Sequence, residues 1–176
     1  MSEIFRPGAG IIFMKVGVHA QESLEDILRR KRRELAEAGR IFWGYGGNTC
    51  HPRNLVQPFA KEMAERRQPL HLVMHKMDSR HFADPALARE YSEDGVEWLP
   101  MPEGIQVRGS RYAMIIGELR EADVDLDLRQ TIVAVGPSRG IRGDQYIGNR
   151  VDKGCFEIGT TDVNAGESTD VRHIDI

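Results

Sequence analysis

Residues 23–39, SLEDILRRKRRELAEAG, carry the strongest structural signal in this chain. Ser23 is a typical helix N-cap, and Asp26 three residues later completes an imperfect capping box. Leucine and isoleucine residues follow at helical spacing, and Gly39 stands where a helix C-cap belongs. The stretch therefore predicts an amphipathic helix over residues 23–38.

Shorter elements flank this helix on both sides. Upstream, GIIFMKVGVH at residues 10–19 is rich in Ile and Val and predicts a first strand. Pro58 suits the first turn of a second helix, and Asp84 followed by Pro85 suits the start of a short third one. Downstream of the first helix we expect, in order, a strand at 41–45, a helix at 57–67, a strand at 70–75 and a short helix at about 84–91.

The apolar pattern then changes to an alternation of period two, which is typical of strands. The expected strands lie at 96–99, 105–107, 111–119, 131–135 and 155–158. Helices are thus concentrated in the N-terminal half, which favours an α+β fold with two to three helices and a curved, mostly antiparallel sheet. A small barrel with the helices outside is one version of this fold. We expect one globular domain at residues 1–158 and a flexible tail at 159–176, which is rich in Thr, Asp, Gly and Ser.

Composition restricts the class of protein. The 176 residues fit one domain, and the net charge of −3 excludes a protein that is basic over its whole surface. The two cysteines form no framework of the secreted kind, and the first residues, MSEIFRPGAG, do not resemble a signal peptide. Since the apolar runs reach about five residues, far below the length of a membrane span, we expect a cytoplasmic protein without membrane contact.

IFWGYGGNTCHP, at residues 41–52, is the most unusual stretch of the chain. On a strand, Trp43 and Tyr45 lie on the same face and could form a wall on which a nucleobase stacks. The alternative is that both rings fill the core, where the nearby glycines permit close packing.

Cys50 and His51, in the same stretch, raise a second hypothesis, a small cysteine-dependent hydrolase or transferase with a histidine base. Neighbouring side chains in an extended segment point in opposite directions, so other histidines are also candidates for the base. These are His71, His75 and His81. The glycine-rich turn before Cys50 could stabilise a thiolate. The alternative is that Cys50 is a small buried side chain.

Two patterns resemble metal sites without satisfying their requirements. His71 and His75 are spaced to share an ion only on a helix, because four residues of strand span about 13 Å. Asp123, Asp125 and Asp127 begin like a calcium loop but lack its later glycine and glutamate. We therefore predict no metal and no cofactor.

Residues 29–33, RRKRR, place five basic side chains within the first helix. Five consecutive residues cover more than one turn, so they cannot all face one partner, and we expect a solvated helix face. Arg30 and Glu34 are spaced as an i,i+4 ion pair. A nucleic-acid contact is the sharper alternative.

GPSRGIRGDQYIGNRVDKG, at residues 136–154, combines five glycines with four basic side chains. Glycine lets backbone N–H groups approach an anion and the basic side chains add charge, so the stretch predicts contact with phosphate. Its glycine spacing fits neither a Walker loop nor a dinucleotide fingerprint. The alternative is a solvated surface loop. The predicted ligand-binding residues are Arg139, Arg142, Arg150, Lys153, Trp43, Tyr45 and Tyr146.

Together, these features favour a binding module for a phosphate-bearing ligand, either a nucleotide or a nucleic acid. Two alternatives remain. One is the cysteine-dependent enzyme. The other is a protein-interaction domain without a small ligand, which the net charge of −3 mildly favours over general nucleic-acid binding.

Overall fold

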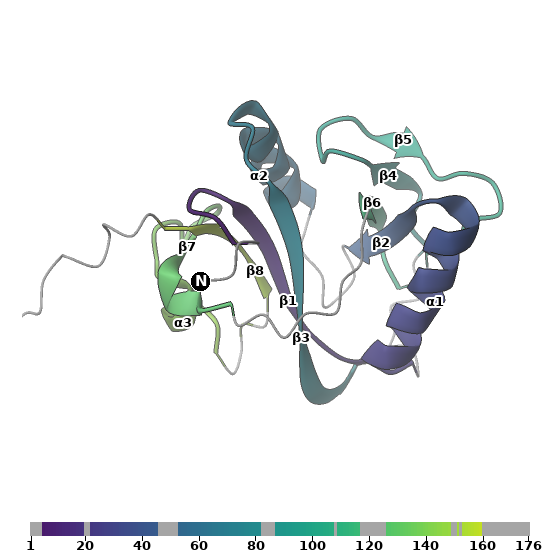
Figure 1. The fold of residues 1–176 in the computed structure, drawn as a ribbon, viewed down its shortest axis with the longest axis horizontal. Coiled ribbons are helices and arrows are strands. Elements are labelled where there is room, and N and C mark those ends of the chain that lie inside the picture. Colours follow the sequence, from purple (N-terminus) through teal and green to yellow (C-terminus); the bar gives the residue numbers. More distant parts are fainter. Residues whose placement is uncertain are drawn as a thin grey trace, which may run out of the picture.

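The computed structural model describes residues 5–19, 22–45, 53–81, 87–107, 109–116, 126–148, 151 and 153–159, with the backbone alone at 16–19, 45 and 76–81. The described part contains eight strands, three α-helices and one 3-10 helix (Figure 1). The strands are β1 (Gly10–His19), β2 (Ile41–Tyr45), β3 (Leu70–His81), β4 (Glu90–Ser92), β5 (Leu99–Pro100), β6 (Tyr112–Ile116), β7 (Thr131–Val133) and β8 (Lys153–Ile158). The helices are α1 (Leu24–Ala38), α2 (Arg53–Glu65), the 3-10 helix η1 (Leu128–Gln130) and α3 (Gly143–Tyr146).

Two four-stranded sheets make up the framework. Sheet A has the strand order β3-β1-β8-β7, and sheet B has the order β2-β6-β4-β5. Both sheets are mixed, because β1 runs parallel to β3 and β4 runs parallel to β6, whereas the other four described pairings are antiparallel. The prediction of an α+β fold with mostly antiparallel pairing is confirmed. The strands are divided between two sheets, however, and neither described sheet closes into a barrel.

β1 lies inside sheet A and is buried on both faces. Ile11 and Phe13 belong to one apolar cluster, which η1 and α3 help to cover. Ile12 and Met14 belong to another cluster, which α2 and strands of both sheets share. Since alternate side chains of a strand point to opposite faces, this one strand supplies two layers of core. That explains why residues 10–14 are continuously apolar or glycine instead of alternating.

α1 confirms the predicted first helix within one residue. Ser23 Oγ accepts the backbone N–H of Asp26 at 3.2 Å and caps the first turn. At the other end Gly39 has a left-handed backbone with φ 69°, and its N–H donates to Leu35 O at 2.9 Å. Both ends are fixed by local signals.

α2 begins at Arg53, earlier than the predicted residue 57, so Pro58 lies inside the helix and not in its first turn. A proline inside a helix costs about 3 kcal/mol. The buried side chains of α2 lie at i, i+3, i+4 and i+7 and are Val56, Phe59, Ala60 and Met63. Burial of each large apolar side chain contributes about 1.5–3 kcal/mol, so together they outweigh the proline.

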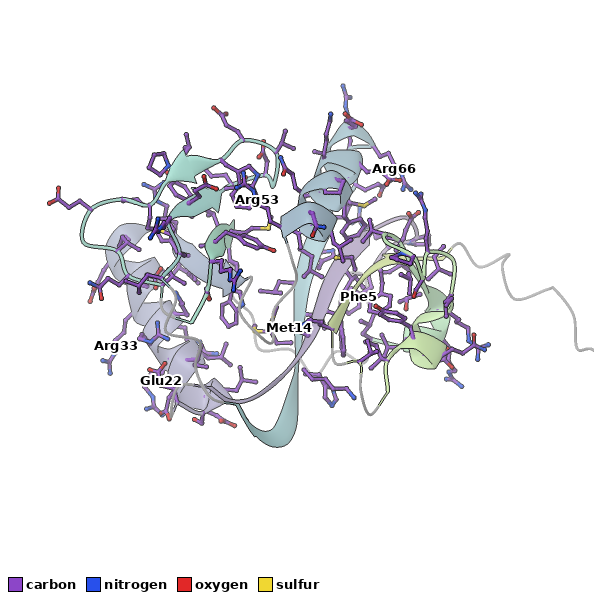
Figure 2. The ribbon with its side chains drawn as sticks, turned by 180° about the vertical axis from the view of Figure 1, so that it is seen from behind. Phe5, Met14, Glu22, Arg33, Arg53 and Arg66 are labelled. Atoms are coloured by element: carbon purple, nitrogen blue, oxygen red, sulfur yellow. The ribbon has the colours of Figure 1, made fainter. Side chains whose placement is uncertain are left out.

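Ion pairs tie α2 to both sheets. At its start, Arg53 pairs with Glu90 of β4 in sheet B. Just beyond its end, Arg66 makes two hydrogen bonds, of 2.8 and 2.7 Å, to Glu157 of β8 in sheet A. Figure 2 shows these two arginines turned toward opposite halves of the molecule. The helix therefore bridges the two sheets over the core cluster that they share.

The prediction of a helix at 84–91 is wrong over the residues that the structure describes, 87–91. Residues 88 and 89 are irregular, and β4 begins at Glu90 and lies between β6 and β5. The ring of Tyr91 packs edge-to-face on Phe42 of β2, with centroids 5.1 Å apart. Contacts that are distant in sequence thus outweigh the local Asp-Pro signal, and residues 82–86 lie outside the described part.

The predicted strand at 96–99 is displaced by a bend at residues 93–97. Asp94 Oδ1 accepts the backbone N–H groups of Val96 and Glu97 at 2.8 and 3.0 Å, which turns the chain before β5. Residues 105–107 form no strand. β1 and β2 have the predicted bounds. Three further strands differ from prediction in length, since β3 extends to His81, β7 ends at Val133 and β8 starts at Lys153. β6 covers 112–116 of the predicted 111–119, and residues 117–119 lie outside the described part.

None of the described helices has the length and apolar character needed to cross a membrane.

Candidate functional site

The predicted ligand-binding residues lie in two separate regions. Trp43 is on β2 in sheet B, whereas Arg139, Arg142, Tyr146 and Lys153 lie on or beside sheet A. In Figure 1, α3 and β7 are on one side of the molecule and β2 is on the other, with β1 and β3 between them. Arg150, Cys50 and His51 lie outside the described residues, and only the backbone of Tyr45 is described. The structure therefore does not bring the aromatic residue Trp43 and the basic residues of 139–153 together.

Trp43 is 6% exposed and belongs to the core cluster between the two sheets. Its neighbours in that cluster include Tyr112 and Met114 of the adjacent strand β6. This is the placement expected if the ring fills the core.

The backbone of the segment 136–141 is occupied by internal hydrogen bonds. The N–H groups of Arg139, Gly140 and Ile141 all donate to carbonyl oxygens of the same turn or of β7. Gly136 and Gly140 have φ values of 81° and 90°, a left-handed conformation that favours glycine. These two glycines therefore shape a tight turn along β7, and the three N–H groups are not available to an anion.

Two further glycines of the stretch 136–154, Gly143 and Gly154, permit close packing. A Cβ atom on Gly143 would lie 2.0 Å from Thr131 Oγ1, and one on Gly154 would lie 2.5 Å from the ring of Phe156. The ring of Tyr146 meets Phe156 edge-to-face, with centroids 6.1 Å apart. The role of these residues in the described structure is to close the outer face of sheet A.

The charge of Arg142 is balanced locally. Its guanidinium donates to both carboxylate oxygens of Asp144, at 2.6 and 3.0 Å. These hydrogen bonds hold the pKa of Asp144 below its ordinary value. Arg139 is freer, since its side chain is 67% exposed and its ion pair with Glu62 is long, at 3.7 Å.

The basic run of α1 divides differently from the prediction. Arg29, Arg30, Arg32 and Arg33 are exposed, but Lys31 is buried at 5% exposure. Arg30 pairs with Glu22, and it is Lys31 that pairs with Glu34. Figure 2 shows Arg33 on the outer side of α1.

The sequence interpretation missed a cluster where β2 ends and α2 begins, which we call the β2–α2 junction and define by Arg53, Glu90, Trp98 and Tyr112. Arg53 is the first residue of α2, and its guanidinium carbon lies 4.3 Å from the centroid of the Trp98 ring. The same guanidinium forms an ion pair with Glu90. Trp98 meets Tyr112 edge-to-face, with centroids 5.2 Å apart. One cation, one anion and two aromatic rings thus meet at one place.

The β2–α2 junction lies where β2 ends and where α2 begins, at the two described ends of the gap 46–52. Tyr45, the last residue of β2, is the register partner of Tyr112, and residue 53 opens α2. Both described residues that flank 46–52 therefore lie at this cluster. The sequence carries no local signal for this cluster, because its four residues come from separate segments.

Arg53 is held in place but is still accessible. Its side chain is 40% exposed, and that of Glu90 is 46% exposed. An ion pair this exposed contributes about 0–1 kcal/mol, and a cation–π contact at such a site about 0.5–1 kcal/mol. The guanidinium can therefore exchange its carboxylate partner for another anion at low cost. Nε1 of Trp98 is enclosed and has no hydrogen-bond partner among the described residues.

The described residues give little support to a metal site or to a cysteine nucleophile. His71 and His75 lie on strand β3, so the helical arrangement that would let them share an ion is absent. No group of three or more His, Cys, Asp or Glu side chains within the described ranges could hold a metal ion. Cys155 is buried, and burial raises the pKa of its thiol to about 12, which makes it a poor nucleophile.

Comparison with known proteins adds no family to this geometry, because no family model, no curated protein and no solved structure matches the chain.

Proposed function

We propose that this protein is a binding module for a phosphate-bearing ligand, a nucleotide or a nucleic acid, and that the ligand is held at the β2–α2 junction. One observation carries the proposal. Arg53 is positioned on the face of Trp98 at the first residue of a 13-residue helix, and its side chain remains 40% exposed.

The chemistry of this arrangement suits a phosphate. The first N–H groups of a helix have no intrahelical partner, and the helix dipole places partial positive charge at that end. Arg53 adds a full positive charge and a planar fork of donors that matches a phosphate group. The carboxylate of Glu90 already occupies this position as an anionic partner. A phosphate could therefore replace it at the guanidinium.

The aromatic rings supply the second part of the proposal. Stacking of a base on an aromatic side chain contributes about 1–3 kcal/mol and tolerates any base, since every base has a flat face. Trp98 is partly exposed, whereas Trp43 and Tyr112 are buried at 6% and 3% exposure. Trp98 is therefore the ring that we assign to ligand contact, in place of Trp43.

The basic residues of 136–153 have a secondary role in this proposal. Arg139 and Lys153 would add long-range attraction for an anionic ligand, which weakens as salt rises. Arg142 is already engaged by Asp144. The cytoplasmic location stays a prediction. The cysteine-dependent enzyme stays a prediction, because Cys50 and His51 lie outside the described residues. The protein-interaction domain also stays a prediction.

The experiment is a titration of the wild type with nucleoside mono-, di- and triphosphates and short single-stranded oligonucleotides, at low and high salt. Loss of one charge-assisted hydrogen bond costs about 1.5–3 kcal/mol, so Arg53→Ala should weaken binding about ten-fold or more, and Arg53→Lys should restore part of it. Arg142→Ala, the matched control, should bind within about two-fold of wild type. If nothing in the panel binds, or if Arg53→Ala binds as well as wild type, the proposal fails.

A further inference from the structure

We infer that Lys31 and Glu34 of α1 form a clamp that closes the outer edge of β2, and that this clamp prevents a second copy of the chain from adding its own β2 strand there. The inference is independent of the proposed function. Among the described strands, β2 is the terminal strand of sheet B and pairs with β6 on one side.

The side of β2 that has no strand partner among the described residues carries backbone N–H and C=O groups. In an antiparallel pair, alternate residues direct N–H and C=O toward the partner strand, and the residues between them direct these groups away. Phe42 is one of the residues whose groups point away from β6. A terminal strand with such open groups is a template for pairing with another chain.

Side chains of α1 form hydrogen bonds with both the N–H and the C=O of Phe42. Lys31 Nζ donates to Phe42 O at 2.5 Å, and Glu34 Oε1 accepts the N–H of Phe42 at 2.8 Å. The two side chains are also joined to each other, since Lys31 Nζ donates to Glu34 Oε2 at 2.8 Å. Three hydrogen bonds thus link Lys31, Glu34 and the backbone of Phe42 to one another.

The burial of this pair argues against an incidental surface contact. The side chains of Lys31 and Glu34 are 6% and 18% exposed. Burial lowers the pKa of Lys31, and its hydrogen bond to Glu34 opposes that shift. A buried ammonium is unfavourable unless its donors are satisfied, and an apolar side chain would fill the same space without that penalty. What an apolar side chain cannot do is to hold the carbonyl of Phe42.

The strand behind the clamp is suited to pairing with itself. IFWGY contains large apolar and aromatic residues of high strand propensity and no charge. Two copies that met edge to edge through β2 would join their B sheets into one continuous sheet. A second copy is therefore the occupant that fits this edge once the clamp is removed.

The test is the assembly state of Lys31→Ala/Glu34→Ala, measured by sedimentation across a range of protein concentrations. The control is Arg33→Ala/Glu37→Ala, which removes one basic and one acidic side chain from exposed positions of the same helix. We expect the clamp variant to form a dimer or larger species at concentrations where wild type and control remain in the same smaller state. A clamp variant that sediments like wild type at every concentration would overturn the inference.

Amide exchange keeps the inference testable if that double variant does not fold. In wild type, the N–H of Phe42 should exchange at least ten-fold more slowly than exposed loop amides, and Glu34→Gln should retain much of this protection because its amide oxygen can still accept. Glu34→Ala should lose it, while the amide of Trp43, which faces β6, should stay protected. Rapid exchange of Phe42 in wild type would contradict the clamp.

Discussion

The β2–α2 junction and the segment 136–148 are built from the same kinds of residue, yet they differ in what is left for a partner. In the segment, internal contacts use the N–H groups of Arg139, Gly140 and Ile141, the close packing at Gly143 and the charge of Arg142. At the junction, Arg53 is held by contacts that are individually weak and remains exposed. The comparison teaches that a basic, glycine-rich stretch indicates a ligand site only if its donors are not already satisfied within the fold.

Thiol labelling should give the largest effect. Cys155 lies on β8 in the core cluster that the two sheets share, and burial raises the pKa of its thiol to about 12. It should resist a thiol reagent at neutral pH, with a rate at least about 100-fold below that of an unhindered cysteine, until the protein unfolds. Any fast labelling of the folded chain must then come from Cys50, the other cysteine of the sequence. Labelling of Cys50 faster than a small thiol in solution would support the cysteine-dependent enzyme, and Cys50→Ala would then be tested for loss of activity.

Glycine substitutions should show that the segment is built for packing. Gly143→Ala would place a Cβ 2.0 Å from Thr131 Oγ1 and 2.9 Å from Leu128 O. We expect overpacking to cost about 1–3 kcal/mol and to lower Tm by about 2–4 °C for each kcal/mol. Gly148→Ala is the matched control, because nothing lies within 4 Å of the position that its Cβ would take, and it should leave Tm nearly unchanged. If Gly143→Ala weakened ligand binding without lowering Tm, the segment would be a binding loop after all.

A double-mutant cycle should measure how firmly Arg53 is held. Arg53→Ala removes both the ion pair with Glu90 and the contact with Trp98. We expect a loss of about 1–2 kcal/mol in the free energy of unfolding, with a coupling to Glu90→Ala of about 0.2–1 kcal/mol, because both side chains are well exposed. Denaturant unfolding of the four proteins gives these values. A coupling several times larger would mean that the pair is a structural tie that a ligand could not displace.

The smallest effect is expected for the ion pair of the segment. In wild type the pKa of Asp144 should lie below its ordinary value of 3.8, and Arg142→Ala should return it toward that value, as measured by NMR titration of the carboxyl group. Since the folded-state pKa is depressed, any stability from the pair is present above pH 3.8 and is lost as pH falls through the lowered pKa. At neutral pH the substitution should leave Tm nearly unchanged, because both groups face solvent. An unshifted pKa in wild type would show that Arg142 is free for another partner.

The elements that could be predicted from the sequence are those with local causes. α1 has a capping serine at one end and a left-handed glycine at the other, and both signals lie within the helix and its flanks. β4 has no such signal, because it depends on pairing with β5 and β6 and on contact with Phe42. The local Asp-Pro pattern therefore predicted a helix where tertiary contacts favour a strand.

The candidate site could not be predicted from the sequence, because it too depends on tertiary contacts. Arg53 and Glu90 are 37 positions apart, and Trp98 follows in a separate segment. No spacing rule connects residues whose proximity depends on how α2 bridges two sheets. Lys31 is a similar case, since a lysine within a basic run suggests exposure, whereas its burial depends on the strand edge that packs beside it.

Tryptophan fluorescence can locate the bound ligand directly, because the chain has two tryptophans and only Trp98 lies at the proposed site. Trp43→Phe leaves Trp98 as the reporter at the β2–α2 junction, and Trp98→Phe leaves Trp43 in the core. With a ligand that binds in the nucleotide and oligonucleotide panel, we predict a saturable change in emission for Trp43→Phe and none for Trp98→Phe. A saturable change that persists in Trp98→Phe and is absent from Trp43→Phe would contradict a site at the junction.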